Sequence, residues 1–88
     1  MNQDILFADI QLWDSVRQAV NFPAQQAGAL ITCWVSLAWL QQHSPNLELA
    51  NKEIILARFV ELRFDLEEIA EEMIEDERFD ECGDITIG

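Results

Sequence analysis

Basic residues are scarce in this sequence of 88 residues, which has five Lys and Arg against 17 Asp and Glu. The formal net charge is −12 and the isoelectric point is near 4.1. We do not expect direct binding to nucleic acid or to an anionic membrane, because both depend on a basic patch. The length allows one small domain, residues 1–88, and is too short for two.

Glycine, proline and cysteine are rare too, at three, two and two residues, while half of the chain is apolar. This balance favours a compact globular fold over a disordered or collagen-like chain. Cys33 and Cys82 are too few for the disulfide framework of a small secreted domain, so we expect two thiols, with one disulfide as the alternative. The first residues also lack the basic segment and apolar stretch of a secretory signal. These features predict a cytoplasmic protein.

Long hydrophobic runs are missing as well. The most apolar stretch, residues 27–40, has 14 residues, whereas a membrane-spanning helix needs about 20. Pro23 precedes this stretch, and Gln pairs bound it on both sides. We interpret it as buried core.

Residues that perform acid–base or nucleophilic chemistry are few, with one His and no Tyr. The sequence has no phosphate-binding glycine loop, no Gly-x-Ser-x-Gly motif and no Cys-x-x-Cys motif. Glu68 and Glu71 have the spacing of carboxylates at dinuclear metal centres, but such centres also need Glu-x-x-His motifs, and His43 lies in a different element. We therefore predict no catalytic residue, no cofactor and no metal site. A small hydrolase or metal-dependent enzyme is the weakest of three functional hypotheses, and the other two are given below.

The hydrophobic patterns predict a single α+β domain in which helices pack on an antiparallel sheet. The expected elements are strands at 5–7, 16–22, 29–35 and 84–87, a short helix at 37–43 and a long helix at about 51–77. Ser36 and Asn51 are the expected N-caps of the two helices. The long helix is either continuous or kinked near Phe64, and residues 8–14 are expected to form a loop anchored by Trp13.

Two apolar patterns define the expected core. Residues 16–22 alternate, which places Val16, Val20 and Phe22 on one face of a strand. The long helix has an apolar stripe with spacings of three and four that includes Phe59, Leu62, Leu66 and Ile69. Residues 29–35 are apolar on both faces, so a second layer, the N-terminal segment or another protomer is needed to cover the face that the helices leave open.

Acidic residues concentrate near the end of the chain, where residues 61–84 contain twelve acids and two Arg. On a helix, five of them form one polar band: Glu61, Asp65, Glu68, Glu72 and Glu75. The band is either a solvated helix face or a surface for a basic partner. Like charges four residues apart disfavour a helix by a few tenths of a kcal/mol per pair, roughly. A sequence selected only for helix stability would place Lys and Arg there.

Several sequence blocks occur together in a distinctive order. They are Phe7-Ala8-Asp9, Trp13-Asp14, Arg17-Gln18-Ala19-Val20-Asn21-Phe22-Pro23-Ala24, Gly28 and Ile31-Thr32-Cys33-Trp34-Val35-Ser36, then a helix with Phe59, Arg63, Ile69 and Ala70. With these blocks the chain resembles domain-of-unknown-function family fourteen-eighty-eight (DUF1488), small uncharacterised bacterial proteins. The resemblance spans nearly the whole chain and implies an α+β fold and a bacterial cytoplasmic protein, with no activity, cofactor or catalytic residue. The family usually has an acid after the Ser that completes a capping box, whereas this chain has Leu37-Ala38-Trp39.

Two functional hypotheses follow. The first is a non-enzymatic protein-interaction module that binds a protein partner or itself. In a homodimer, Trp34 or Trp39 would lie at the contact, because aromatic residues concentrate there; burial in the core is the alternative for both. The second hypothesis is an acidic decoy, in which the acidic band occupies the basic site of a nucleic-acid-binding protein.

Overall fold

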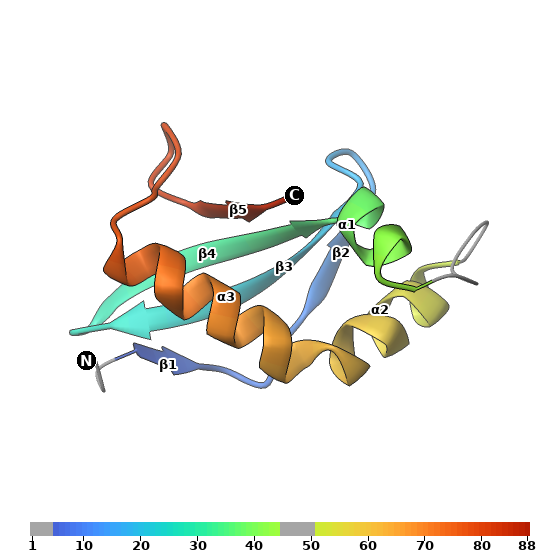
Figure 1. Cartoon of the computed structure of the whole chain (residues 1–88), viewed down its shortest axis with the longest axis horizontal. Coiled ribbons are helices and arrows are strands. Elements are labelled where there is room, and N and C mark those ends of the chain that lie inside the picture. Colours follow the sequence, from blue (N-terminus) through green and yellow to red (C-terminus); the bar gives the residue numbers. More distant parts are fainter. Residues whose placement is uncertain (1–4, 45–50) are drawn as a thin grey trace.

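A computed structural model of the chain describes residues 5–44 and 51–88 and shows one β-sheet with helices packed on one face (Figure 1). The strands are β1 (Ile5–Phe7), β2 (Leu12–Asp14), β3 (Ala19–Gln26), β4 (Ala29–Ser36) and β5 (Ile85–Ile87). The helices are α1 (Leu37–Gln42), α2 (Lys52–Glu61) and α3 (Arg63–Glu75). The predicted α+β fold class is confirmed.

The sheet is mixed, so the prediction of an antiparallel sheet was wrong in one pairing. Its order is β1-β3-β4-β5, and β2 also pairs with β3. Three pairings are antiparallel, but β5 runs parallel to β4. The chain leaves β4 and passes through the helices before it returns to the same sheet, and a crossover of this kind brings the next strand back in the parallel sense.

The strand predicted at 16–22 begins at Ala19, because the preceding residues form a turn. The carboxylate of Asp14 accepts hydrogen bonds from the backbone N–H of Val16 at 2.9 Å and of Arg17 at 3.0 Å. Gln18 then adopts a positive φ of 53°. Val16 is consequently 91% exposed and does not belong to the core. The side-chain hydrogen bonds of Asp14 therefore hold residues 15–18 in a turn, although the apolar residues from Val16 onward alternate as in a strand.

The strand β3 continues through Pro23 to Gln26, beyond the predicted end, and turns into β4 by the two residues Ala27 and Gly28. Both have positive φ, 52° and 85°, as tight hairpin turns require. Pro23 is tolerated because β1 pairs only with residues 24–26 and β2 only with residues 19–21. Pro23 therefore has a strand partner on one side only. A residue without an N–H group removes the fewest sheet hydrogen bonds at such a position. The loop expected at 8–14 is shorter, because residues 12–14 form β2.

Both predicted helix caps are confirmed. The Ser36 hydroxyl accepts a hydrogen bond from the N–H of Trp39 at 3.0 Å, and the Asn51 side chain accepts one from the N–H of Ile54 at 3.0 Å. The long helix predicted at about 51–77 is two helices, α2 and α3, separated at Leu62 and not at Phe64. Within residues 5–44 and 51–88, no helix has the length and apolarity needed to cross a membrane.

The core lies between the helices and the face of the sheet that they cover. Phe59 of α2 and Leu66 of α3 have no exposed surface, and the rings of Phe59 and Phe22 are 5.1 Å apart. Leu62 and Ile69 pack against this core while partly exposed. The predicted helix stripe is thus confirmed, and it meets a sheet face made by these residues: Val20, Phe22, Ala24, Ile31, Cys33, Val35, Ile85 and Ile87.

Candidate interaction surfaces

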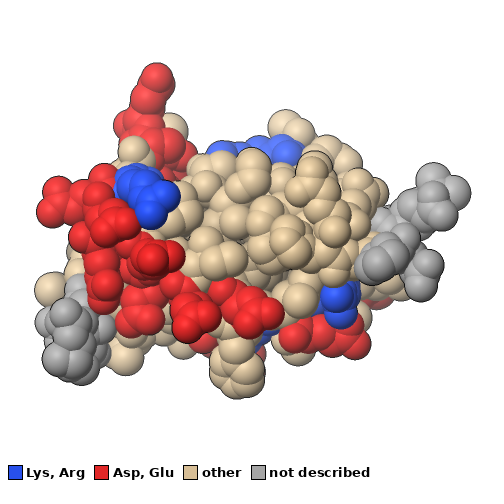
Figure 2. All heavy atoms as spheres, viewed as in Figure 1, with Lys and Arg blue, Asp and Glu red and all other residues tan. Residues whose placement is uncertain are grey.

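The predicted acidic band lies mostly on α3. Asp65, Glu68, Glu72 and Glu75 are exposed there, whereas Glu61 is the last residue of α2, on the other side of the break at Leu62. Glu61 also forms an ion pair with Arg58 at 2.9 Å. Figure 2 shows acidic side chains gathered over α3 and the segment that follows it, while most of the remaining surface in this view is uncharged. The structure therefore keeps four residues of the band together and separates the fifth.

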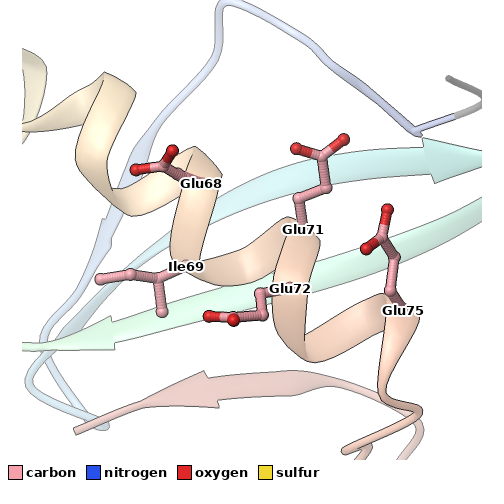
Figure 3. A pocket seen from close by; sticks show the side chains of 5 residues that line it. All are labelled: Glu68, Ile69, Glu71, Glu72 and Glu75. Atoms are coloured by element: carbon pink, nitrogen blue, oxygen red, sulfur yellow. The ribbon is translucent and has the colours of Figure 1, made fainter. Parts of the chain in front are cut away.

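Three of these acids line a shallow depression of about 360 Å³ on α3, namely Glu68, Glu72 and Glu75, together with Glu71 and Ile69 (Figure 3). In Figure 3 the carboxylates of Glu71 and Glu75 point to one side of the helix and that of Glu72 to the other. No group of three or more His, Cys, Asp or Glu in residues 5–44 and 51–88 is placed to hold a metal ion. The depression thus presents spread negative charge.

The one basic residue of α3, Arg63, is directed at the loop that separates β1 from β2. Its guanidinium donates hydrogen bonds to the carbonyl of Ala8 at 3.2 Å, to that of Ile10 at 3.5 Å and to the side chain of Gln11. It also pairs with Glu67 at 3.0 Å, and its side chain is only 12% exposed. Sequence reasoning missed this role, since the contacts join residues more than fifty positions apart; the only signal was the presence of Arg63 among the residues of the DUF1488 resemblance.

The second face of the sheet carries no helix. Side chains that alternate with the core residues point to this face, which we call the open face. Leu6, Leu12 and Leu30 lie on it and are 63%, 58% and 79% exposed. The sequence predicted that residues 29–35 would be apolar on both faces and that the helices would cover only one. Leu30 confirms this expectation, because it lies on the same strand as the buried Cys33 and points the opposite way.

Trp34 and Trp39, the two tryptophans expected at a dimer contact, do not share a surface. Trp34 lies on the open face but is 9% exposed, because the Arg17 guanidinium covers its ring at 3.8 Å. Its indole N–H also donates a hydrogen bond to the Asp84 carboxylate at 3.0 Å. Trp39 packs against the core from α1 and stacks on His43, with ring centroids 3.8 Å apart. The open face therefore contains Trp34 and not Trp39.

Two groups near β5 have shifted pKa values. Burial raises the pKa of the Cys33 thiol to about 12, and the negative charge of Asp84 adds to the shift. The pKa of Asp80 is lowered, chiefly because the N–H of Asp84 donates a hydrogen bond to its carboxylate at 2.9 Å. The N–H of Cys82 donates another at 2.8 Å, so Asp80 organises the turn before β5. Cys33 is buried and Cys82 exposed, and both are free.

The profile of the family described as "Protein of unknown function (DUF1488)" matches residues 5–87. The chain belongs to the DUF1488 family. It is 37% identical over 83 residues to the uncharacterised protein YrdB of Escherichia coli K12 and 36% identical to that of Shigella flexneri, with 94% of each chain covered in both cases.

A crystal structure shows the same fold. It is that of a protein of unknown function from the DUF1488 family of Shewanella loihica PV-4, with 39% identity and a TM-score of 0.92. The match covers 99% of this chain and 94% of that one. The family expected from the sequence blocks is therefore confirmed.

Proposed function

We propose that this DUF1488 chain is a non-enzymatic protein-interaction module of the bacterial cytoplasm, which forms a weak homodimer through the open face of its sheet. The observation that supports it is the exposure of Leu6, Leu12 and Leu30 on a sheet face without a covering layer. Leu6 and Leu30 lie on either side of Gln25, and Leu12 lies four residues further along β3. Exposed apolar side chains on an uncovered sheet face are typical of protein–protein contacts. The two free cysteines agree with a reducing compartment.

The open face is small for a protein–protein interface. Strands β3 and β4 have eight residues each, which corresponds to about 26 Å at 3.3 Å per residue. Four strands spaced by about 4.8 Å give a width of roughly 14–19 Å, hence an area of roughly 350–500 Å². A standard interface buries about 800 Å² per partner. The open face is thus smaller than a standard interface, and we expect a weak dimer with a dissociation constant in the micromolar range.

The charge distribution permits a second copy at this face in spite of the net charge of −12. The acids of α3 lie on the side of the sheet that faces away from the contact. Two sheets packed about 10 Å apart, each with a helix layer about 10 Å further out, hold the two α3 helices about 30 Å apart. That distance exceeds three Debye lengths of about 8 Å at physiological salt, so the repulsion is largely screened.

Sedimentation equilibrium across the micromolar range tests this proposal. Leu30→Glu places a charge among the exposed apolar side chains of the contact, and because Leu30 is 79% exposed the monomer should still fold. The matched control is Val60→Glu, on α2 and 50% exposed, which should leave the dimer intact. A 10 kDa species at every concentration of the unmodified chain would contradict the proposal, as would equal association of the two variants.

The acidic decoy is the second candidate, and one observation favours it. Asp65, Glu68, Glu72 and Glu75 have no ion-pair partner among the described residues. A decoy complex should weaken steeply with ionic strength and be displaced by a DNA duplex. In affinity capture from cell extract, replacing Glu68, Glu72 and Glu75 by Gln should abolish capture of the nucleic-acid-binding partner. If the triple variant captures the same proteins as the unmodified chain, the decoy function is contradicted.

A further inference from the structure

The strand β1 is an edge of the sheet. In the described part of the chain it pairs only with β3, through Ile5, Leu6 and Phe7, so its outer backbone groups have no strand partner. Edge strands usually carry a charge or a proline that discourages a further strand. The three residues of β1 include neither. Its outer edge can therefore accept an added strand of about the same length.

A groove of about 400 Å³ runs between β1 and α3. Its apolar lining is formed by Ile5, Phe7 and Phe64. Phe7 is fixed by stacking on the buried Phe22, with ring centroids 6.2 Å apart, whereas Phe64 is 84% exposed. An occupant of this groove would bury the Phe64 ring and lie directly beside β1.

Charge determines which occupant fits. Besides Phe64, the α3 wall of the groove carries four carboxylates, those of Asp65, Glu67, Glu68 and Glu71. Glu67 is paired with Arg63, and no ion pair joins the other three to a described residue. An acidic segment would be repelled there, while a segment with Lys or Arg would neutralise the wall at short range.

We propose that the β1–α3 groove binds an extended basic segment of a partner protein, which adds to the sheet as a strand beside β1. Alternate side chains of a strand lie on one face about 6.6–6.8 Å apart. Carboxylates one helical turn apart, such as Glu68 and Glu71, have Cβ atoms about 5–6 Å apart. Two basic residues separated by one residue therefore match the wall, while the intervening residue points to the other face beside Leu6, where an apolar side chain fits. The partner motif is basic–apolar–basic.

This binding mode does not rest on the open-face dimer. The added strand is held by the edge of β1 and by the carboxylates on the helix side of the sheet, and only its intervening residue lies beside Leu6, whereas self-association uses the opposite face around Leu30. The two proposals are therefore separable: loss of peptide binding leaves the sedimentation behaviour unchanged, and a monomeric chain can still bind the peptide.

The probe is a fluorescent peptide of sequence Lys-Val-Arg-Val-Lys, titrated by anisotropy at physiological salt. The test variant is Glu68→Gln with Glu71→Gln, in the groove wall, and it should raise the dissociation constant at least about tenfold. The matched control is Glu72→Gln with Glu75→Gln, which removes the same charge from the same helix outside the groove. It should raise the dissociation constant less than about threefold. Thermal melts of both variants check that the fold is intact.

A second peptide separates strand addition from diffuse attraction between opposite charges. N-methylation of alternate backbone nitrogens preserves its charge and removes strand hydrogen bonds, so this peptide should bind at least about tenfold more weakly. With the first peptide, the amide signals of Ile5, Leu6 and Phe7 should shift in NMR spectra. Equal weakening by the two double variants, equal binding of the two peptides, or no binding of the first peptide at millimolar concentration would each overturn the proposal.

Discussion

Replacing Leu66 by Ala is the sharpest test of how the helices are held on the sheet. Leu66 has no exposed surface and belongs to the cluster that joins α3 to β3, β4 and β5. Removing three buried carbons forfeits about 2.4 kcal/mol of transfer free energy at about 0.8 kcal/mol per carbon. The residual cavity adds to this, so the free energy of unfolding should fall by about 2–5 kcal/mol.

That loss is large for a chain of this size. A domain of 88 residues has a total stability of about 4–13 kcal/mol, at about 0.05–0.15 kcal/mol per residue. A loss of about 3 kcal/mol should lower the Tm by about 12–24 °C. The assay is reversible urea unfolding at one fixed protein concentration, followed by circular dichroism.

The matched control is Phe64→Ala on the same helix. Phe64 is apolar and larger than Leu66, but 84% exposed, so its truncation should change the free energy of unfolding by less than about 0.5 kcal/mol. A loss below about 0.5 kcal/mol for Leu66→Ala, or equal losses for the two variants, would refute the packing of α3 against the sheet.

Two further predictions concern the residues near β5. The lowered pKa of Asp80 means that its carboxylate stabilises the folded chain at neutral pH, and that this contribution is lost as the pH falls from about 4 through the folded-state value. Asp80→Ala should therefore melt below the unmodified chain at about pH 7, with a gap that narrows in acid; a gap independent of pH would contradict this. Because Cys33 is buried with its pKa raised to about 12, a thiol reagent should label only Cys82 in the folded chain and both thiols in denaturant. Cys82→Ser should then abolish native labelling, and rapid labelling of that variant would show Cys33 to be accessible.

Local patterns in the sequence sufficed for features that depend on neighbouring residues. The Ser36 and Asn51 caps each bond a backbone N–H three positions ahead, so short sequence windows contain both partners. The helix stripe with Phe59 and Leu66 follows from the period of the helix alone. The turn at Asp14 is equally local, because its side chain accepts hydrogen bonds from N–H groups two and three positions ahead, but the alternating pattern from Val16 predicts a strand at the same residues.

The surfaces depended on contacts that no short window contains. Composition established that the end of the chain is acidic, but only the packing of α3 beside β1 places Glu68 and Glu71 on the wall of a groove. Arg63 pairs with Glu67 of that wall, and its other hydrogen bonds go to carbonyls of the β1–β2 loop. Trp34, an expected contact residue, is covered by Arg17.

The sequence by itself therefore determined the α+β class, the helix caps, the buried stripe and the excess of acid, because each is a property of spacing or composition. Only the tertiary structure decided that β5 returns parallel to β4. It also decided which side chains meet across the chain. The physical reason is that these outcomes arise from pairings between distant segments, whose free energy depends on the whole packed arrangement and leaves little trace in any local pattern.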